Sequence, residues 1–113
     1  MIKNIFISFI LLLTLPFTLS AQMRTITGKV LDGDFDNTPL IGATIKVVND
    51  DESAPVLGTA TDIDGKFTLD VPTVATELSV TFIGYETEFV KLVPEKSEYT
   101  VVLRSNSNKI NEV

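Results

Sequence analysis

Two short acidic segments carry the side chains best suited to holding a metal ion. They are Asp32–Asp36, with the sequence DGDFD, and Asp62–Gly65, with the sequence DIDG. Alternating carboxylates are typical of calcium loops, but the helix-loop-helix form needs a bidentate glutamate at its twelfth position. Counted from the start of each segment, that position is occupied by Ala43 and by Thr73. Both segments therefore fit solvated turns better, because each contains an Asp-Gly pair whose glycine accepts a positive φ. A calcium site of another geometry at Asp32–Asp36 stays open.

Chemistry that depends on cysteine or histidine is excluded, because the chain contains neither residue. This removes thiolate nucleophiles, disulfides, imidazole bases and the usual zinc ligands. A serine nucleophile would have no histidine base. Apart from Glu77 or Glu86 at strand starts, no acid lies isolated in an apolar run that would raise its pKa by burial. We therefore expect a non-enzymatic protein with no catalytic residue, no cofactor and no metal ligand that the sequence identifies.

The charge balance argues against a nucleic-acid partner. The chain has 15 acidic and 9 basic residues, a formal net charge of −6. Phosphate binding needs a basic face, which this composition does not favour. A length of 113 residues fits one domain. What remains is a small acidic domain that binds a partner or serves as a structural part.

Residues 1–21 have the pattern of a secretory signal peptide. Lys3 supplies the positive start, Ile5–Leu19 the apolar run, and Ser20 and Ala21 the small residues before the cut. A spanning helix needs about 20 apolar residues, and this run is shorter and interrupted by Pro16. We predict cleavage after Ala21, with Ser20 as the alternative, and a mature chain without a direct membrane span. Export without cysteine favours a Gram-negative envelope over the eukaryotic secretory route.

The sequence after Gln22 predicts a series of short strands. About one third of its residues are Val, Ile or Thr, which pack well on a pleated surface. Apolar and polar residues alternate, and Gly and Pro recur at intervals of roughly ten residues, as in an all-β sandwich. We predict a seven-stranded antiparallel β-sandwich over residues 22–104, because alternation buries one face of each strand. The predicted strands span residues 24–31, 43–48, 56–61, 66–71, 77–83, 85–92 and 98–104.

Two places in this pattern are less regular. In the segment 85–92, Tyr85 and Phe89 compete with Val90 and Leu92 for the inward face, which predicts an edge strand or a bulge. Phe35 is an aromatic residue amid three aspartates, so it either stacks on a ligand or covers the end of the sandwich. The cover is the favoured interpretation, and the absence of Trp leaves little for a sugar-stacking platform.

Four segments occur in an order that resembles a known family. They are Ile26–Asp32 (ITGKVLD), Pro39–Ile45 (PLIGATI), Gly58–Phe67 (GTATDIDGKF) and Leu78–Tyr85 (LSVTFIGY). Together they resemble the carboxypeptidase regulatory-like domain of Bacteroidetes, in the form found at the N-terminus of SusC-like TonB-dependent outer-membrane receptors. The resemblance covers Thr25–Arg104. It implies a seven-stranded transthyretin-like sandwich and no peptidase activity.

The same resemblance gives a meaning to residues 105–113. In these receptors, a short linker after the last strand leads to the TonB box, which joins the sheet of an energising partner as an added strand. Ile110, Asn111, Glu112 and Val113 are similar to the opening of that box. An extended apolar segment on a polar tether is what strand addition requires. The resemblance thus implies a TonB-type energising protein as partner, together with a receptor plug and barrel and an outer-membrane surface lipoprotein.

Two functions follow as expectations. The first is a non-enzymatic domain in the periplasm, or on the periplasmic side of the outer membrane, of a receptor for glycan or peptide uptake. It would act in protein contact and in tethering the TonB box. The alternative is a free-standing secreted sandwich that binds carbohydrate or another envelope protein.

Overall fold

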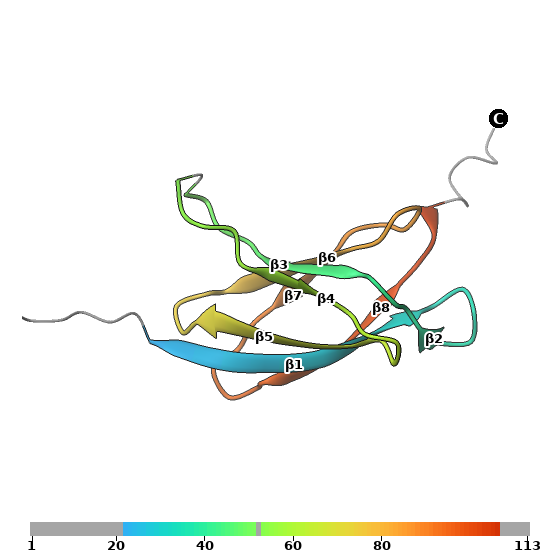
Figure 1. Cartoon of the computed structure of the whole chain (residues 1–113), viewed down its shortest axis with the longest axis horizontal. Coiled ribbons are helices and arrows are strands. Elements are labelled where there is room, and N and C mark those ends of the chain that lie inside the picture. The colour runs from blue at the N-terminus through green and yellow to red at the C-terminus, as the bar shows by residue number, and fades with distance from the viewer. Residues whose placement is uncertain (1–21, 52, 107–113) are drawn as a thin grey trace, which may run out of the picture.

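Two four-stranded β-sheets face each other in the computed structural model of the chain, which describes residues 22–51 and 53–106 (Figure 1). Every regular element in those residues is a strand, which confirms the predicted all-β sandwich. The strands are β1 (Met23–Asp32), β2 (Thr38–Pro39), β3 (Thr44–Val47), β4 (Gly58–Ala60), β5 (Lys66–Pro72), β6 (Glu77–Thr81), β7 (Glu88–Lys91) and β8 (Glu98–Leu103).

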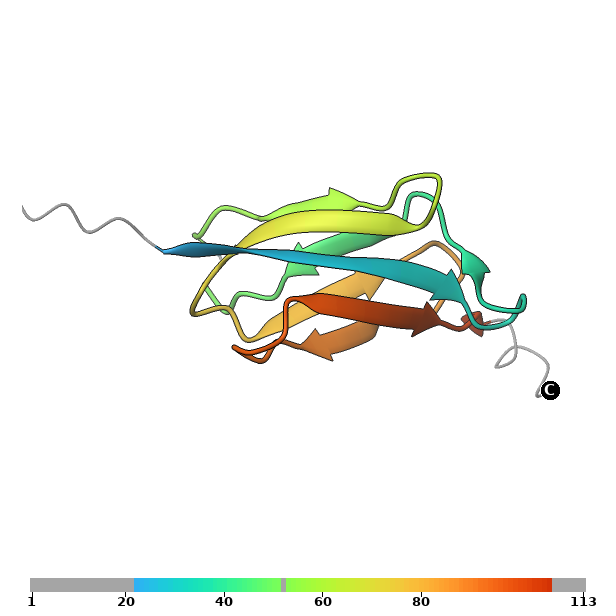
Figure 2. The same cartoon turned by 90° about the horizontal axis from the view of Figure 1, so that it is seen from below.

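β1 is the central strand of the first sheet. It pairs antiparallel with β5 over Met23–Lys29 and with the short β2 at Leu31 and Asp32. It also pairs with β8, in parallel, over Thr27–Asp32. Alternate residues of β1 bond to opposite neighbours, since Thr27 N donates to Ser97 O and Val30 N donates to Gly65 O, both at 2.8 Å. Figure 2 shows β1 and β8 side by side with their arrowheads at the same end.

The second sheet is antiparallel throughout, in the order β4-β3-β6-β7. β3 is held on both sides, so that Ile45 pairs with Thr59 of β4 and with Val80 of β6. β7 is an edge strand, as the irregular alternation of segment 85–92 predicted. Leu92 is buried after it, whereas Phe89 is 58% exposed and faces away from the core.

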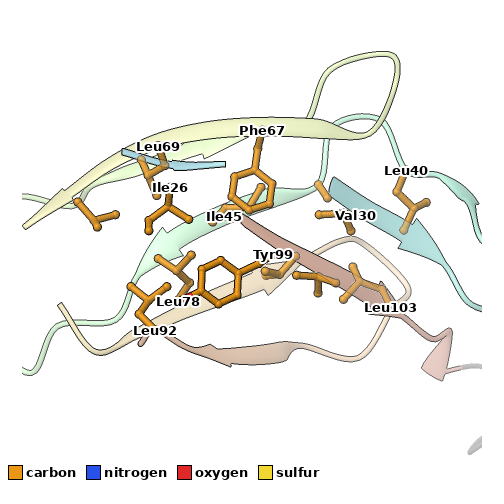
Figure 3. Close-up of a cluster of buried hydrophobic side chains, with 14 residues drawn as sticks. Ile26, Val30, Leu40, Ile45, Phe67, Leu69, Leu78, Leu92, Tyr99 and Leu103 are labelled. Carbon is orange, nitrogen blue, oxygen red and sulfur yellow. The ribbon is translucent and has the colours of Figure 1, made fainter. Parts of the chain in front are cut away.

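The core lies between the two sheets and follows the alternation of the sequence. In β5, Phe67, Leu69 and Val71 are buried, and the residues between them are exposed. Fully burying one such side chain contributes about 1.5–3 kcal/mol. Figure 3 shows side chains from both sheets meeting in one layer. The buried apolar residues are Ile26, Val30, Leu40, Ala43, Ile45, Phe67, Leu69, Val71, Leu78, Val80, Leu92, Tyr99, Val101 and Leu103.

Each of the seven predicted segments contains a strand, but two features were not predicted. The additional strand β2 has only two residues, one of them a proline, and so carries no alternation to detect. The pairing of β1 with β8 is parallel, whereas all other pairs are antiparallel. Alternation indicates which face of a strand is buried, and it does not indicate the direction of the neighbouring strand.

No helix in residues 22–51 and 53–106 is long and apolar enough to cross a membrane. The predicted signal peptide, residues 1–21, lies outside the described residues and stays a prediction.

Gly28 allows three strands to meet at the centre of the first sheet. It lies on β1 opposite Phe67 of β5 and Tyr99 of β8. A Cβ atom at this position would collide with the carbonyl oxygen of Tyr99 and would lie 2.7 Å from the ring of Phe67. The absence of a side chain therefore makes room for the Phe67 ring inside the core.

We predict that Gly28→Ala lowers the free energy of unfolding by about 2 kcal/mol, because the added methyl group overpacks a site bounded by main chain. Thr27→Ala is the matched control, since it changes the neighbouring exposed residue of the same strand and should cost less than about 1 kcal/mol. Urea unfolding of both variants measures the two values. If both variants lost the same free energy of unfolding, the close approach of Tyr99 and Phe67 to Gly28 would not limit stability.

Candidate functional site

The predicted TonB-box-like residues Ile110, Asn111, Glu112 and Val113 lie outside the described residues, so their role stays a prediction. The structure describes the chain as far as Asn106, which precedes the first of the predicted TonB-box-like residues by four positions in the sequence. The candidate site is therefore the base of the tail. We call it the exit site and define it as residues 32–34, 84–86 and 104–106.

The loop after β1 holds one side of the exit site. Gly33 N donates to Leu103 O at 2.8 Å, and Ser105 N donates to a carboxylate oxygen of Asp34 at 2.9 Å. The Arg104 guanidinium lies 3.9 Å from the other oxygen of Asp34, with an arginine side chain that is 69% exposed. An ion pair so open to solvent contributes little. The hydrogen bonds to main-chain amides therefore hold this side.

The turn after β6 holds the other side. Tyr85 and Ser105 form an isolated antiparallel bridge. Next to it, Glu86 N donates to Arg104 O at 2.9 Å and Asn106 N donates to Gly84 O at 3.0 Å. The hydrogen-bonded part of the chain thus extends through Asn106, two residues beyond the predicted end of the domain at Arg104.

Asp32 is the buried centre of the exit site. It is only 6% exposed. One carboxylate oxygen accepts a hydrogen bond from Asp34 N at 3.0 Å, and the other accepts one from the Tyr85 hydroxyl at 2.5 Å. Burying a carboxylate without partners is costly, and here both oxygens have one. A single side chain at the end of β1 thereby joins the loop after β1 to the turn after β6.

The bond to Asp32 also changes the acidity of Tyr85. Chiefly because its hydroxyl donates to this carboxylate, and further through desolvation and the negative charges of Asp32 and Asp34, the pKa of Tyr85 is raised above 10.0. The ring of Tyr85 packs edge-on against Phe82, with centroids 5.4 Å apart at 73°. The neutral phenol is thus the form that suits the folded exit site.

The sequence analysis missed the pairing of Asp32 with Tyr85, although one signal for it was present. Inward positions of β1 fall on even numbers, with Ile26 and Val30 fully buried. Asp32 continues this series and is therefore an aspartate at an inward position. Its partner, 53 residues away along the chain, had no comparable signal.

The two acidic segments form turns. In the first, Asn37 N donates to Asp32 O at 2.9 Å, and the left-handed conformations fall on Asp36 (φ 51°) and Asn37 (φ 56°). Aspartate and asparagine tolerate this region better than most residues. Gly33, which the sequence favoured for it, is not among the residues with positive φ.

The second segment matches the predicted Asp-Gly turn. Gly65 has a φ of 73°, and one oxygen of Asp62 accepts hydrogen bonds from Asp64 N and Lys66 N at 2.9 Å. Across residues 22–51 and 53–106, no group of three or more acidic side chains is arranged to hold a metal ion.

Phe35 does not cover the sandwich end, and that prediction is wrong. Its side chain is 69% exposed, whereas Asp32 and Tyr85 make the contact that closes this end. A second exposed aromatic, Phe89, borders an open hollow of about 430 Å³ on the outer face of the second sheet. Lys46 and Ser79 line the same hollow.

Comparison with known protein families shows which family the chain belongs to. Residues 26–113 match the CarboxypepD_reg-like domain. The chain belongs to this family. The match includes most of the sandwich, the exit site and the residues after it. It agrees with the family resemblance that the sequence motifs indicated.

A curated relative of this CarboxypepD_reg-like domain is the TonB-dependent receptor P3 of Formosa agariphila. The two are 28% identical over 105 residues, which cover 93% of this chain and 10% of the receptor. The chain thus spans about a tenth of the length of the curated relative it matches.

Solved structures share the fold at low sequence identity. The 3-chlorocatechol 1,2-dioxygenase of Rhodococcus opacus 1CP has a TM-score of 0.54 at 14% identity, over 80% of this chain and 63% of that chain. The hydroxyquinol 1,2-dioxygenase of Pseudomonas putida DLL-E4 has a TM-score of 0.56 at 14% identity, over 80% and 58%. At this identity the likeness shows the sandwich fold alone.

We predict that Tyr85→Phe lowers the midpoint of urea unfolding, because it removes a hydrogen bond to a buried carboxylate. In an Asp32→Asn background the same change should lower the midpoint less. Urea unfolding of the two single variants and the double variant measures this coupling. Equal shifts in both backgrounds would mean that the bond between the two side chains does not stabilise the exit site.

The raised pKa of Tyr85 predicts a specific alkaline behaviour. A folded-state pKa above the unfolded value means that the stabilisation is complete below pH 10 and is lost as pH rises through the raised pKa. Because Tyr85 and Tyr99 are the two tyrosines of the chain, subtracting the tyrosinate absorbance curve of Tyr85→Phe isolates Tyr85. Its midpoint should lie above 10.0 and should fall in Asp32→Asn. A midpoint that Asp32→Asn leaves unchanged would contradict the assigned cause.

Proposed function

We propose that this chain is the non-enzymatic N-terminal extension of a SusC-like TonB-dependent receptor for glycan or peptide uptake. The observation that carries the proposal is its 28% identity with TonB-dependent receptor P3 over 105 residues. Since the match spans 10% of that receptor, the chain would supply one domain of a much longer protein. The plug and barrel of the receptor, and an outer-membrane surface lipoprotein, would be its neighbours.

In this proposal the exit site is the base of the TonB-box tether. Hydrogen bonds on two sides hold residues 104–106 against the sandwich. Ile110 lies four residues beyond Asn106, so an extended tether lets it reach at most about 14 Å from that point. Ile110–Val113 would then join the sheet of a TonB-type energising protein as an added strand.

The proposal includes a location and the absence of catalysis. The signal-peptide pattern of residues 1–21 supports export to the periplasm or to the periplasmic side of the outer membrane. The carboxylates of Asp32 and Asp34 bond to main-chain amides and to a tyrosine. Such bonds support a structural role for these acids, since a general acid or base needs free access to a substrate.

A second candidate is a free-standing secreted module that binds carbohydrate or another envelope protein. The observation in its favour is Phe89, which is 58% exposed beside the hollow on the second sheet. An exposed aromatic next to polar groups can stack on a sugar ring or on an apolar side chain.

Fractionation of the source cells separates the two candidates. An antibody raised against residues 22–113 should detect a band of receptor size in the outer membrane. A band of 12.4 kDa or less in the soluble periplasm would overturn the receptor proposal and favour the free-standing module.

The partner is tested by cross-linking to the purified periplasmic domain of a TonB-type protein. The chain has no cysteine, so Asn111→Cys gives one attachment point for a photoreactive label. This variant should cross-link to the TonB-type domain. The control variant Val56→Cys should not cross-link, although Val56 is 77% exposed on the loop between β3 and β4. Equal yields at both positions would mean that the tail is not a specific binding segment.

A further inference from the structure

The first and last strands of the domain are direct neighbours that run in the same direction. β1 and β8 pair in parallel from Thr27 opposite Glu98 to Asp32 opposite Leu103. Gln22 directly precedes β1, and Asn106 follows β8 by three residues. Figure 2 shows that β1 begins at one end of the sandwich and that β8 finishes at the other.

This arrangement determines how the domain responds to tension between its two ends. Such tension pulls β1 toward its N-terminal end and β8 toward its C-terminal end. The two strands are therefore pulled in opposite directions along their shared ladder of hydrogen bonds. Parallel ladders have evenly spaced hydrogen bonds, and tension along the strands stretches all of them together. Tension across a ladder instead opens it one residue pair at a time.

The start of β8 is tied to β1 by a side chain. The Arg24 guanidinium of β1 donates to the carbonyl oxygens of Val93, Pro94 and Lys96, at 3.2, 3.3 and 3.1 Å. The same turn is closed by Tyr99, whose hydroxyl accepts from Val93 N at 3.0 Å and donates to Lys96 O at 2.9 Å. The segment that leads into β8 therefore cannot move away from β1 without breaking these bonds.

The C-terminal end of β8 is held by hydrogen bonds at the exit site. Gly33 N bonds to Leu103 O at 2.8 Å, and Asp34 accepts from Ser105 N at 2.9 Å. These contacts join the segment after β1 to the segment after β8, so the parallel ladder is braced at both of its ends. β1 is also held along its opposite edge by seven residue pairs with β5, from Met23 to Lys29.

We propose that the domain is a mechanical clamp, which resists tension applied between Gln22 and Asn106 more strongly than tension applied across a pair of strands. The property resides in the parallel pairing of β1 with β8 and in the braces at Arg24 and at the exit site. It does not depend on the proposed receptor function, because it applies equally to a free-standing module.

Single-molecule pulling of the full chain in two directions tests the clamp. Because the chain has no cysteine, paired cysteine variants place the pulling handles uniquely. Gln22→Cys with Asn106→Cys applies tension end to end. Gln22→Cys with Val74→Cys pulls across the ladder of β1 and β5, because Thr73 N bonds to Gln22 O at 2.9 Å and Val74 is 83% exposed.

The end-to-end pair should unfold at a median force at least twice that of the crosswise pair, at the same pulling rate. Forced unfolding reports the barrier to unfolding along the pulled direction, and both variants share one fold. Urea unfolding of the unlabelled variants supplies the control, with equal midpoints expected. An end-to-end force equal to or below the crosswise force would overturn the proposal.

Discussion

Hydrogen bonding along both edges of β1 is the constraint on which the rest of the domain depends. An antiparallel neighbour, β5, and a parallel neighbour, β8, must approach the same strand and still leave its inward side chains in the core. Gly28 makes this possible, because a Cβ atom there would meet the main chain of β8 and the Phe67 ring of β5. The pairing also brings the first and last strands together, so that the beginning and the end of the domain support each other.

The buried carboxylate of Asp32 extends this constraint to the exit of the chain. It stands at the last inward position of β1 and accepts hydrogen bonds from its own loop and from Tyr85 of the second half of the chain. In a setting of low polarity such bonds are stronger than in water, and a missing partner is correspondingly costly. The carboxylates of Asp32 and Asp34 thus connect the loop after β1 to Tyr85 and Ser105.

The family and the fold support different statements about function. Membership of the CarboxypepD_reg-like family and the likeness to a TonB-dependent receptor relate the chain to a receptor module. The likeness to two dioxygenases at 14% identity shows how widely the sandwich is used, because one fold can carry unrelated sites. The property that we infer from the topology of this sandwich is mechanical resistance, because the start of β1 and the end of β8 lie at opposite ends of two paired parallel strands.

The sequence by itself determined what depends on neighbouring residues. Alternation of apolar and polar residues located every strand long enough to show it, and an Asp-Gly pair located the turn at Gly65. Tertiary structure alone decided the parallel direction of β8, the exposure of Phe35 and the bond between Asp32 and Tyr85. The physical reason is range: a period of two residues reports which face is buried, whereas the choice of partner joins positions more than 50 residues apart.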